Sequence, residues 1–277
     1  MPFIGTQPAE TALTTGNLGD DIVTLAKLAS GTDGNIISYD SSGNPVAIAT
    51  GNDGQVLTSA GAGAQPAFET VSASGSLKSV QVFTSTGTYT KPAGINLIRV
   101  ELCGSGGGGA GGDNSNNLGG AGAAGGYASE LIDVSSLSST VAVTIGAGGA
   151  GGGDDADGSA GATTSFGSYL SATGGAAGDT NIGVNSPGGV GSGGHINLNG
   201  GGGGGQGGQP TTYQGGHMGA ASYFGGGGAA SNSTTTTDRN ALCPGSGGAG
   251  GGAQTDPASQ RLGGAGAAGI CIVWEYS

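Results

Sequence analysis

The sequence predicts an all-β protein in three parts: a stem of short-strand repeats, a small β-sandwich platform and a polyglycine II helix bundle at the tip. Three observations support this fold class. Residues 31–70 contain an internal repeat, alternating apolar strands flank a glycine-rich segment, and that segment holds most of the glycine. Of the 68 glycines, 13 precede Gly104 and the other 55 lie between Gly104 and Gly269, so this segment cannot build an ordinary side-chain core.

Residues 1–30 are predicted to form an N-terminal attachment segment with one short helix. The helix is expected at residues 20–29, where two aspartates lie in the first turn and favour the helix dipole, and aliphatic residues share one face. This apolar face is too small for a helix that stands alone. The segment is therefore expected to dock on a partner or on copies of itself.

Residues 31–79 are predicted to form a β-repeat stem and a linker. The sequence GTDGNIIS at 31–38 recurs as GNDGQVLT at 51–58, a period of twenty residues. Each copy reads as a turn, a short strand, a second turn and a second short strand. One such hairpin is marginal alone, and repeats of this kind bury apolar residues by stacking or by intertwining with other chains. We therefore expect an oligomeric shaft, most simply a homotrimer.

Residues 80–277 are predicted to form a β-sandwich into which the glycine-rich domain, residues 104–269, is inserted. The last strand is expected to pair with residues 97–103, so that the glycine-rich segment starts and ends on the same platform. Cys103 and Cys271 would then be neighbours with free thiols, because the three cysteines show neither metal-type spacing nor a disulfide framework. Strands are expected at 80–84, 88–91, 97–103, 127–134, 141–145 and 269–276.

Three structures compete for the glycine-rich segment. Collagen needs glycine at every third position and abundant proline, whereas these glycines run consecutively and only four prolines fall in the segment. A flexible linker is the alternative that composition favours, since glycine loses the most entropy on folding. A bundle of polyglycine II threads, bonded to one another through N–H and C=O groups, is predicted because large residues recur between the glycine runs. These residues are Tyr127, Phe166, Tyr169, Leu170, Ile182, Val184, Ile196, Leu198, Tyr213, Tyr223 and Phe224, and the aromatic ones are expected to cap the faces of the bundle.

Threads that run up and down from the platform would place alternate connections together at the far end, where recognition residues collect on loops. Within these connections, Tyr213, His217 and Met218 offer stacking and apolar surface that suits a sugar or a receptor loop. Two basic residues, Arg239 and Arg261, could bind an acidic receptor or a phosphate group. The receptor-binding candidates are Tyr213, His217, Met218, Asp238, Arg239, Asn240 and Arg261.

No cofactor or metal is expected, and the protein is not predicted to be an enzyme. Residues 108–113 fit the start of a calcium-binding nonapeptide, but Ser115 stands where a large apolar residue is due and no repeat follows. Three aspartates at 154–157 could hold a hard cation, although a solvated acidic loop is the simpler reading. Neither His195 nor His217 has a cysteine beside it for zinc, and the chain offers no defined carboxylate pair for cleaving polysaccharide.

The charge of the chain excludes some partners. Six basic residues against eighteen acidic ones give a net charge of −12, which repels phosphate backbones and anionic lipids. No apolar run approaches the ~20 residues that span a bilayer, and the first residues lack the pattern of a signal peptide. Neither nucleic-acid binding nor membrane insertion is expected, and export would need another route such as lysis of the cell.

Several stretches resemble the glycine-rich domain of bacteriophage tail fibres. They are FTSTGTYTKPAGINLIRVELCGSGGGGAGG, GGYASELIDVSSL, VAVTIGAGGAGG, TSFGSYLSATGG, a late GGAGAAG and the terminal GICIVWEYS. Residues 31–69 are similar to the stem repeat of tail fibre proteins. The resemblance implies a trimeric fibre, assembled in the host cytoplasm and joined at its N-terminus to the virion tail or to an upstream fibre protein. Its glycine-rich tip would bind a host surface protein or glycan.

The expected function is therefore that of a structural virion component that acts outside the cell as a tail fibre or adhesin. A capsid (head) fibre or decoration protein is the alternative within the virion. A polyglycine ice-binding protein is an alternative of another class, which would need one flat regular face and no oligomeric stem.

Overall fold

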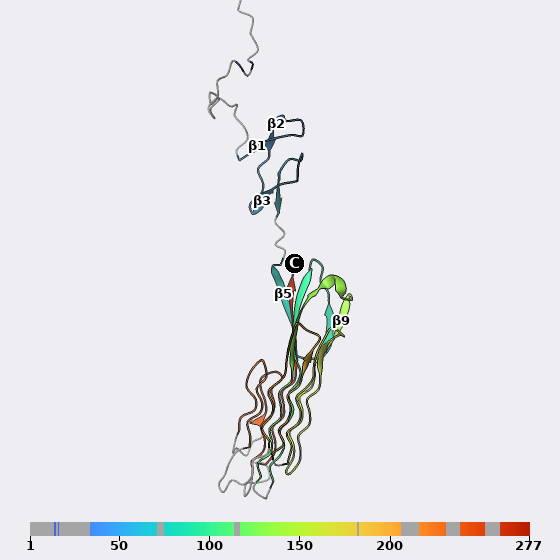
Figure 1. Cartoon of the computed structure of the whole chain (residues 1–277), viewed down its shortest axis with the longest axis vertical. Helices are drawn as coiled ribbons and strands as arrows, with labels where there is room; N and C mark the ends of the chain where they lie inside the picture. The colour runs from blue at the N-terminus through green and yellow to red at the C-terminus, as the bar shows by residue number, and fades with distance from the viewer. Residues whose placement is uncertain are drawn as a thin grey trace, which may run out of the picture. The chain divides into compact units, whose positions relative to one another are not determined.

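The computed structural model describes residues 14, 16, 34–70, 75–113, 117–181, 183–205, 216–230, 239–252 and 261–277. The chain divides into two compact units, Met1–Ser72 and Ala73–Ser277 (Figure 1). The helix predicted at residues 20–29 lies outside the described residues. No helix in the described ranges has the length and apolar character needed to cross a membrane.

The first unit contains two β-hairpins, as the twenty-residue repeat predicts. β1 (Ile36–Tyr39) pairs with β2 (Pro45–Ile48), and β3 (Gln55–Thr58) pairs with β4 (Ala67–Thr70), both antiparallel. The carboxylate of Asp40 accepts hydrogen bonds from the amides of Ser42 and Asn44 at 2.8 Å and so closes the first hairpin turn. Gly43 takes a φ of +81° there, which suits glycine. Among the described residues of this unit, Ile48 is the one buried hydrophobic side chain.

The second unit begins with a sandwich of two antiparallel five-stranded sheets. The front sheet has the order β13-β8-β7-β14-β5, and the back sheet has the order β12-β11-β10-β9-β6. Both layers are seen edge-on in Figure 1. The elements are β5 (Leu77–Phe83), β6 (Gly87–Thr90), β7 (Leu97–Cys103), β8 (Tyr127–Asp133), the short 3₁₀ helix η3 (Val134–Ser136), β9 (Thr140–Thr144), β10 (Thr164–Phe166), β11 (Leu170–Ala172), β12 (Gly191–Ser192), β13 (Ile196–Leu198) and β14 (Ile270–Tyr276).

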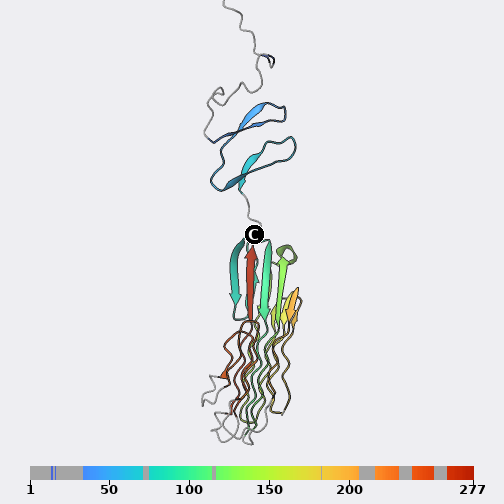
Figure 2. The same ribbon diagram turned by 60° about the vertical axis from the view of Figure 1, so that its left-hand side comes forward.

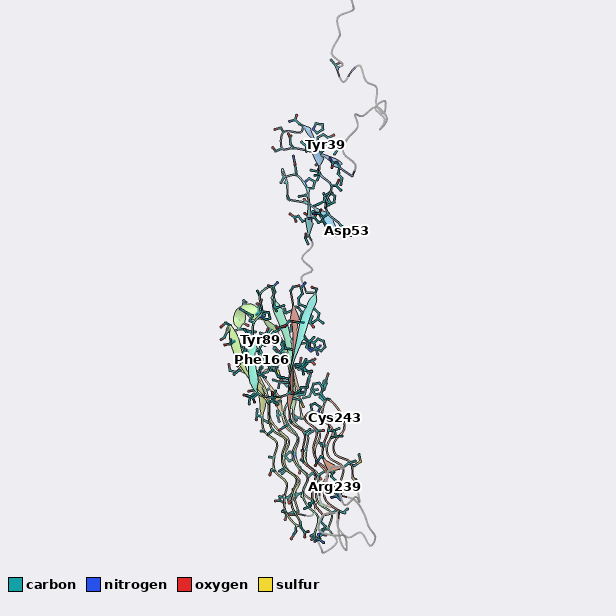
Figure 3. All side chains as sticks on the ribbon, turned by 180° about the vertical axis from the view of Figure 1, so that it is seen from behind. Tyr39, Asp53, Tyr89, Phe166, Arg239 and Cys243 are labelled. Carbon is teal, nitrogen blue, oxygen red and sulfur yellow. The ribbon has the colours of Figure 1, made fainter. Side chains whose placement is uncertain are left out.

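Alternating side chains of the two sheets meet in one apolar core. Val100 and Leu102 of β7 and Val273 of β14 are fully buried there, opposite Tyr89 of β6 and Phe166 of β10. The rings of Tyr89 and Phe166 lie 5.5 Å apart between centroids, and Figure 3 labels both residues in the sandwich. Each such ring stabilises the fold by about 2–3 kcal/mol through burial. The side-chain core therefore belongs to the sandwich.

The predicted closure of the platform by the last strand is confirmed. β14 pairs with β7 over its whole length, from Ile270 opposite Cys103 to Tyr276 opposite Leu97. Cys271 lies opposite Leu102, one position away from Cys103, so the two thiols point to opposite faces of the sheet. Both are buried and free, and burial raises the pKa of each thiol to about 12.

Four strands within the glycine-rich segment were not among those expected from the sequence: β10, β11, β12 and β13. Phe166, predicted to cap the bundle, lies instead in the sandwich core together with Leu170, and β13 contains Ile196 and Leu198. These strands hold only two or three residues, too few to show an alternating pattern. The glycine-rich segment therefore returns to the sandwich repeatedly and supplies part of both sheets. β5 also differs from the prediction, because it begins at Leu77, three residues before the predicted start.

Candidate functional site

The glycine-rich stretches form extended threads joined by backbone hydrogen bonds. The thread 104–113 leaves β7, and each of its amides donates to a neighbouring thread. Amides three positions apart donate to the same neighbour, which is the repeat of a helix with three residues per turn, as in polyglycine II. One neighbour is the thread 261–269, with the pairs Gly106–Ala267, Gly109–Gly264 and Gly112–Arg261 at 2.7–2.9 Å. A second is 117–126, with the pairs Gly107–Ala123 and Ala110–Gly120; a third is 156–163, with the pairs Gly108–Ser159 and Gly111–Ala156.

The carbonyls of the same thread accept bonds from three further threads. Among the described residues, thread 104–113 thus exchanges hydrogen bonds with six neighbours. The donors lie in thread 145–155 (Gly149, Gly152, Asp155), thread 173–181 (Gly175, Gly178) and thread 245–252 (Gly248, Gly251). The first three neighbours run antiparallel to it and the last three run parallel. The packing is hexagonal, and it satisfies the buried backbone groups without side chains.

The thread 117–126, which leads back into β8, is surrounded in the same way. Its amides donate to threads 173–181, 199–205 and 245–252, again with a repeat of three. Its carbonyls accept from threads 104–113, 183–190 and 216–221. Residues 104–112 and 118–126 are buried throughout. Threads 104–113 and 117–126 are therefore the centre of a core made of peptide groups.

Glycine is required where two threads touch. A Cβ atom on Gly107 would lie 2.0 Å from the carbonyl oxygen of Ala176, and one on Gly248 would lie 2.0 Å from that of Gly264. Such distances are far below any real contact of a Cβ atom. A smaller set of buried positions does have room for a methyl group, and alanine occupies them: Ala110, Ala121, Ala123, Ala124 and Ala249.

The bundle has a sandwich end and a far end. Threads leave β7, β9, β11 and β13, and threads return into β8, β10, β12 and β14. Figure 1 shows them running side by side away from the two sheets. At the far end the amide of Asp113 donates to the carbonyl of Asn117, and in the turn 153–157 Asp155 takes a φ of +51°. The far end thus gathers turns that are distant in sequence.

Aspartates at the far end tie threads to one another. The carboxylate of Asp157 accepts from the amide and the hydroxyl of Thr180, at 2.7 and 2.9 Å. The carboxylate of Asp154 pairs with the guanidinium of Arg261, with 2.5 Å to Nε and 2.6 Å to Nη2. Among the residues that the structure describes, no group of three or more His, Cys, Asp or Glu could hold a metal ion.

The two basic candidates, Arg239 and Arg261, form contacts within the bundle. Arg239 is fully buried, and its guanidinium donates to the carbonyl of Leu262 at 2.9 Å (Figure 3). Asn240 accepts from the amide of Ala265 at 2.8 Å. The structure brings Arg239, Asn240 and Arg261 together on the thread 261–269 and its neighbours. Their geometry favours a role in joining threads over a role in contacting a receptor.

The other candidates divide into described and undescribed residues. Met218 is 67% exposed. His217 lies beside it, half-buried, with its backbone carbonyl accepting from Gly250 at 2.8 Å and its Nε2 atom buried without a hydrogen bond in the described part of the chain. Tyr213 and Asp238 lie outside the described residues. Their assignment as receptor contacts stays a prediction.

An aromatic cluster that the sequence did not single out as a site lies where the bundle meets the front sheet. The ring of Tyr223 stacks on that of Tyr127 at 3.8 Å between centroids, and Phe224 meets both rings edge-on. Burial raises the pKa of Tyr127 to about 12. A pocket of about 220 Å³ beside the stack is lined by Leu198 and Asn199 among others. The adjacent aromatics Tyr223 and Phe224, directly before the run of four glycines, are the sequence signal for this cluster.

The fold and the bundle together define a glycine-rich β-sandwich domain whose core continues as hydrogen-bonded threads. The model of the glycine-rich domain family matches residues 82–276, and the chain belongs to that family. Comparison with curated proteins finds no match.

Proposed function

We propose that the protein is a structural component of a bacteriophage virion, a tail fibre or adhesin that binds a host cell-surface receptor through the far end of the thread bundle. One observation supports this most strongly: the far-end turns stand on a core of backbone hydrogen bonds. Because the described threads are joined mainly through backbone groups, the sequence of these turns can vary with little loss to the scaffold. Loops on a rigid scaffold are the usual place for recognition residues.

The resemblance of residues 31–69 to the stem repeat of tail fibres supports the same proposal. In this account the N-terminal segment joins the virion tail or an upstream fibre protein, and the hairpins of three chains form a shaft. Several copies on one particle then bind with avidity even when each site is weak. The ligand is a host surface protein or glycan.

We propose fewer receptor-contact residues than the sequence alone suggests. Met218 is exposed, whereas Arg239 is buried and Arg261 is paired with Asp154. We therefore place the contact surface around Tyr213, His217 and Met218 and the stretch that contains Asp238. In this proposal the thioether of Met218 and the rings of Tyr213 and His217 contact the receptor, while Arg239 and Arg261 join neighbouring threads.

A loop exchange tests the proposal. Residues 206–218 and 231–238, which contain Tyr213, His217, Met218 and Asp238, are replaced by the corresponding residues of another tail fibre that has a glycine-rich domain and a different bacterial host, while residues 219–230 and 239–252 are kept. Binding of the fluorescent chain to whole cells of the new host is then expected, with loss of binding to the original host. A folded chimera that still binds only the original host would refute the far-end site.

Attachment to the tail rather than the head is tested on the particle itself. Gold-labelled antibody against residues 31–277 is expected to decorate the tail fibres in electron micrographs. Labelling distributed over the capsid would support the capsid fibre or decoration protein instead.

A further inference from the structure

The outward faces of the two sheets differ sharply in composition. Cross-strand register places small and hydroxylated residues on the outward face of the back sheet: Thr88, Thr90, Thr140, Ala142, Thr144, Ser165, Ser171 and Ser192. This is the pattern of an antiparallel sheet with one face in the core and one face in water.

The outward face of the front sheet carries many aliphatic side chains instead, on both sides of the ion pair that Arg99 and Glu101 form on the central strand β7. Six aliphatic side chains on it are between 40% and 55% exposed: Leu77, Val80, Val82, Leu131, Ile196 and Leu198. Ile272 and Trp274 of β14, the strand between β5 and the central strand β7, occupy register positions of the same face. Figure 2 shows the five strands of this sheet side by side, with β14 in red. We call these eight residues the front face.

We propose that the front face binds a second copy of this chain. A strand with apolar residues on both of its faces is typical of a sheet that is covered on both sides. Exposed apolar side chains gathered on one face of a domain mark an interaction surface. The outward face of the back sheet is polar and serves as the comparison, because both sheets pack on the same core and face the same solvent.

Charge favours a copy of the same chain as the occupant. The chain carries a net charge of −12, so two copies repel each other over most of their surface. The charged residues at register positions of this sheet face are Arg99, Glu101 and Asp133, and Arg99 is already paired with Glu101. The front faces of two copies can therefore approach with little electrostatic repulsion, whereas contact through acidic surfaces of the two copies is opposed by like charges.

The two hairpins of the first unit also favour a second copy of the chain as the partner, because they expose apolar side chains. Their side chains Ile37, Tyr39 and Val56 are 64%, 65% and 49% exposed. Repeats that bury so little within one chain gain their core from neighbouring copies. Six residues separate Thr70 of β4 from Leu77 of β5, a reach of at most about 25 Å. Copies that associate through their hairpins therefore hold their front sheets at high local concentration.

Trp274 makes the proposal testable on the full chain, because it is the only tryptophan of the sequence and it lies on the front face. The wild type is compared with Val82→Asp, on the edge strand β5 of the front sheet, and with the matched control Thr88→Asp, on the edge strand β6 of the back sheet. Both substituted side chains are exposed on the outward face of an edge strand. Mass is measured by sedimentation, and access to Trp274 by acrylamide quenching of its fluorescence.

The wild type and Thr88→Asp are expected to sediment as oligomers with Trp274 shielded. Val82→Asp is expected to raise acrylamide quenching about twofold, because the desolvated centre of the interface opens. Leu131→Asp on β8 repeats the test from another strand if circular dichroism shows that Val82→Asp has unfolded. A monomeric wild type, equal quenching in the wild type and the folded front-face variants, or an equal effect of Thr88→Asp would each overturn the proposal. No host cell enters the experiment, so its outcome is independent of receptor binding.

Discussion

At the level of single residues, the glycines of the thread bundle are important because they have no Cβ atom. Where two threads touch, the hydrogen of glycine leaves room for a carbonyl oxygen of the next thread, and a methyl group does not fit. Alanine is found at several fully buried positions of the threads, among them Ala110, Ala121 and Ala249. Specificity of packing, which side-chain shape gives to an ordinary core, here comes from the order of glycine and alanine along the chain.

Two glycine substitutions test this directly. Gly107→Ala places a methyl group 2.0 Å from the carbonyl oxygen of Ala176 and is expected to lower the free energy of unfolding by about 1–3 kcal/mol, the usual cost of overpacking. Gly153→Ala has no atom within 4 Å of the new methyl group and is expected to be neutral or slightly stabilising, since it restricts the unfolded chain. Urea unfolding measures both. Equal losses in the two variants would contradict the account.

The buried thiols predict a pattern of chemical labelling. Burial raises the pKa of Cys103 and of Cys271 to about 12, so almost no reactive thiolate forms at pH 8. Iodoacetamide is expected to label Cys243, which is only partly buried, and to spare the other two until urea is added. Peptide mass spectrometry reads the sites. Equal labelling of all three cysteines in the native protein would show that the sandwich core is open.

The same pKa shifts give stability a pH dependence. The native state keeps both thiols neutral, whereas in the unfolded chain they ionise near their ordinary pKa of 9. The stabilisation is complete below pH 9 and is lost as the pH rises toward 12. The urea midpoint is therefore expected to fall between pH 8 and pH 10.5. A Cys271→Val variant should show a shallower fall, and an identical slope would remove Cys271 as a cause.

At the scale of elements, threads and strands alternate, and each strand fixes the start of the next thread. The sequence predicts the hairpins and the longer strands because four or more residues show a clear pattern, as in Leu97–Cys103. It does not predict β10 to β13, which are too short, nor which threads are neighbours, since one glycine run is like another. The inward roles of Arg239 and Arg261 also need the structure, because a sequence does not show which carbonyl or carboxylate a charge will meet.

The ion pair of Arg261 with Asp154 is expected to join two threads at the far end. Its bonds are bidentate, with the arginine side chain only 14% exposed and the aspartate side chain 41% exposed. A double-mutant cycle with Arg261→Met and Asp154→Asn is expected to give a coupling free energy of about 0.5–1 kcal/mol, after allowance for solvent screening at the exposed carboxylate. The coupling should shrink in 1 M salt. Additive effects of the two substitutions would mean that the pair contributes nothing.

At the scale of the second unit, two kinds of core are joined end to end. The sandwich excludes water with aromatic and aliphatic side chains, and the bundle continues from its strands with a lattice of peptide hydrogen bonds. Such a lattice is directional, because a shift of one thread by a single residue breaks every bond to its six neighbours. The thread bundle is therefore a rigid support, with few side chains of its own, for turns whose sequence can vary.

The central claim is that residues 104–269 fold through backbone hydrogen bonds, and amide hydrogen exchange on the full chain tests it most directly. Buried, bonded amides exchange only when the structure opens, whereas those of a flexible linker exchange at the rate of an unfolded chain. NMR is expected to show that amides of residues 104–112 and 119–126 exchange as slowly as those of β7 and β14. Exchange of these glycine amides at unfolded-chain rates, while β7 and β14 stay protected, would contradict the account.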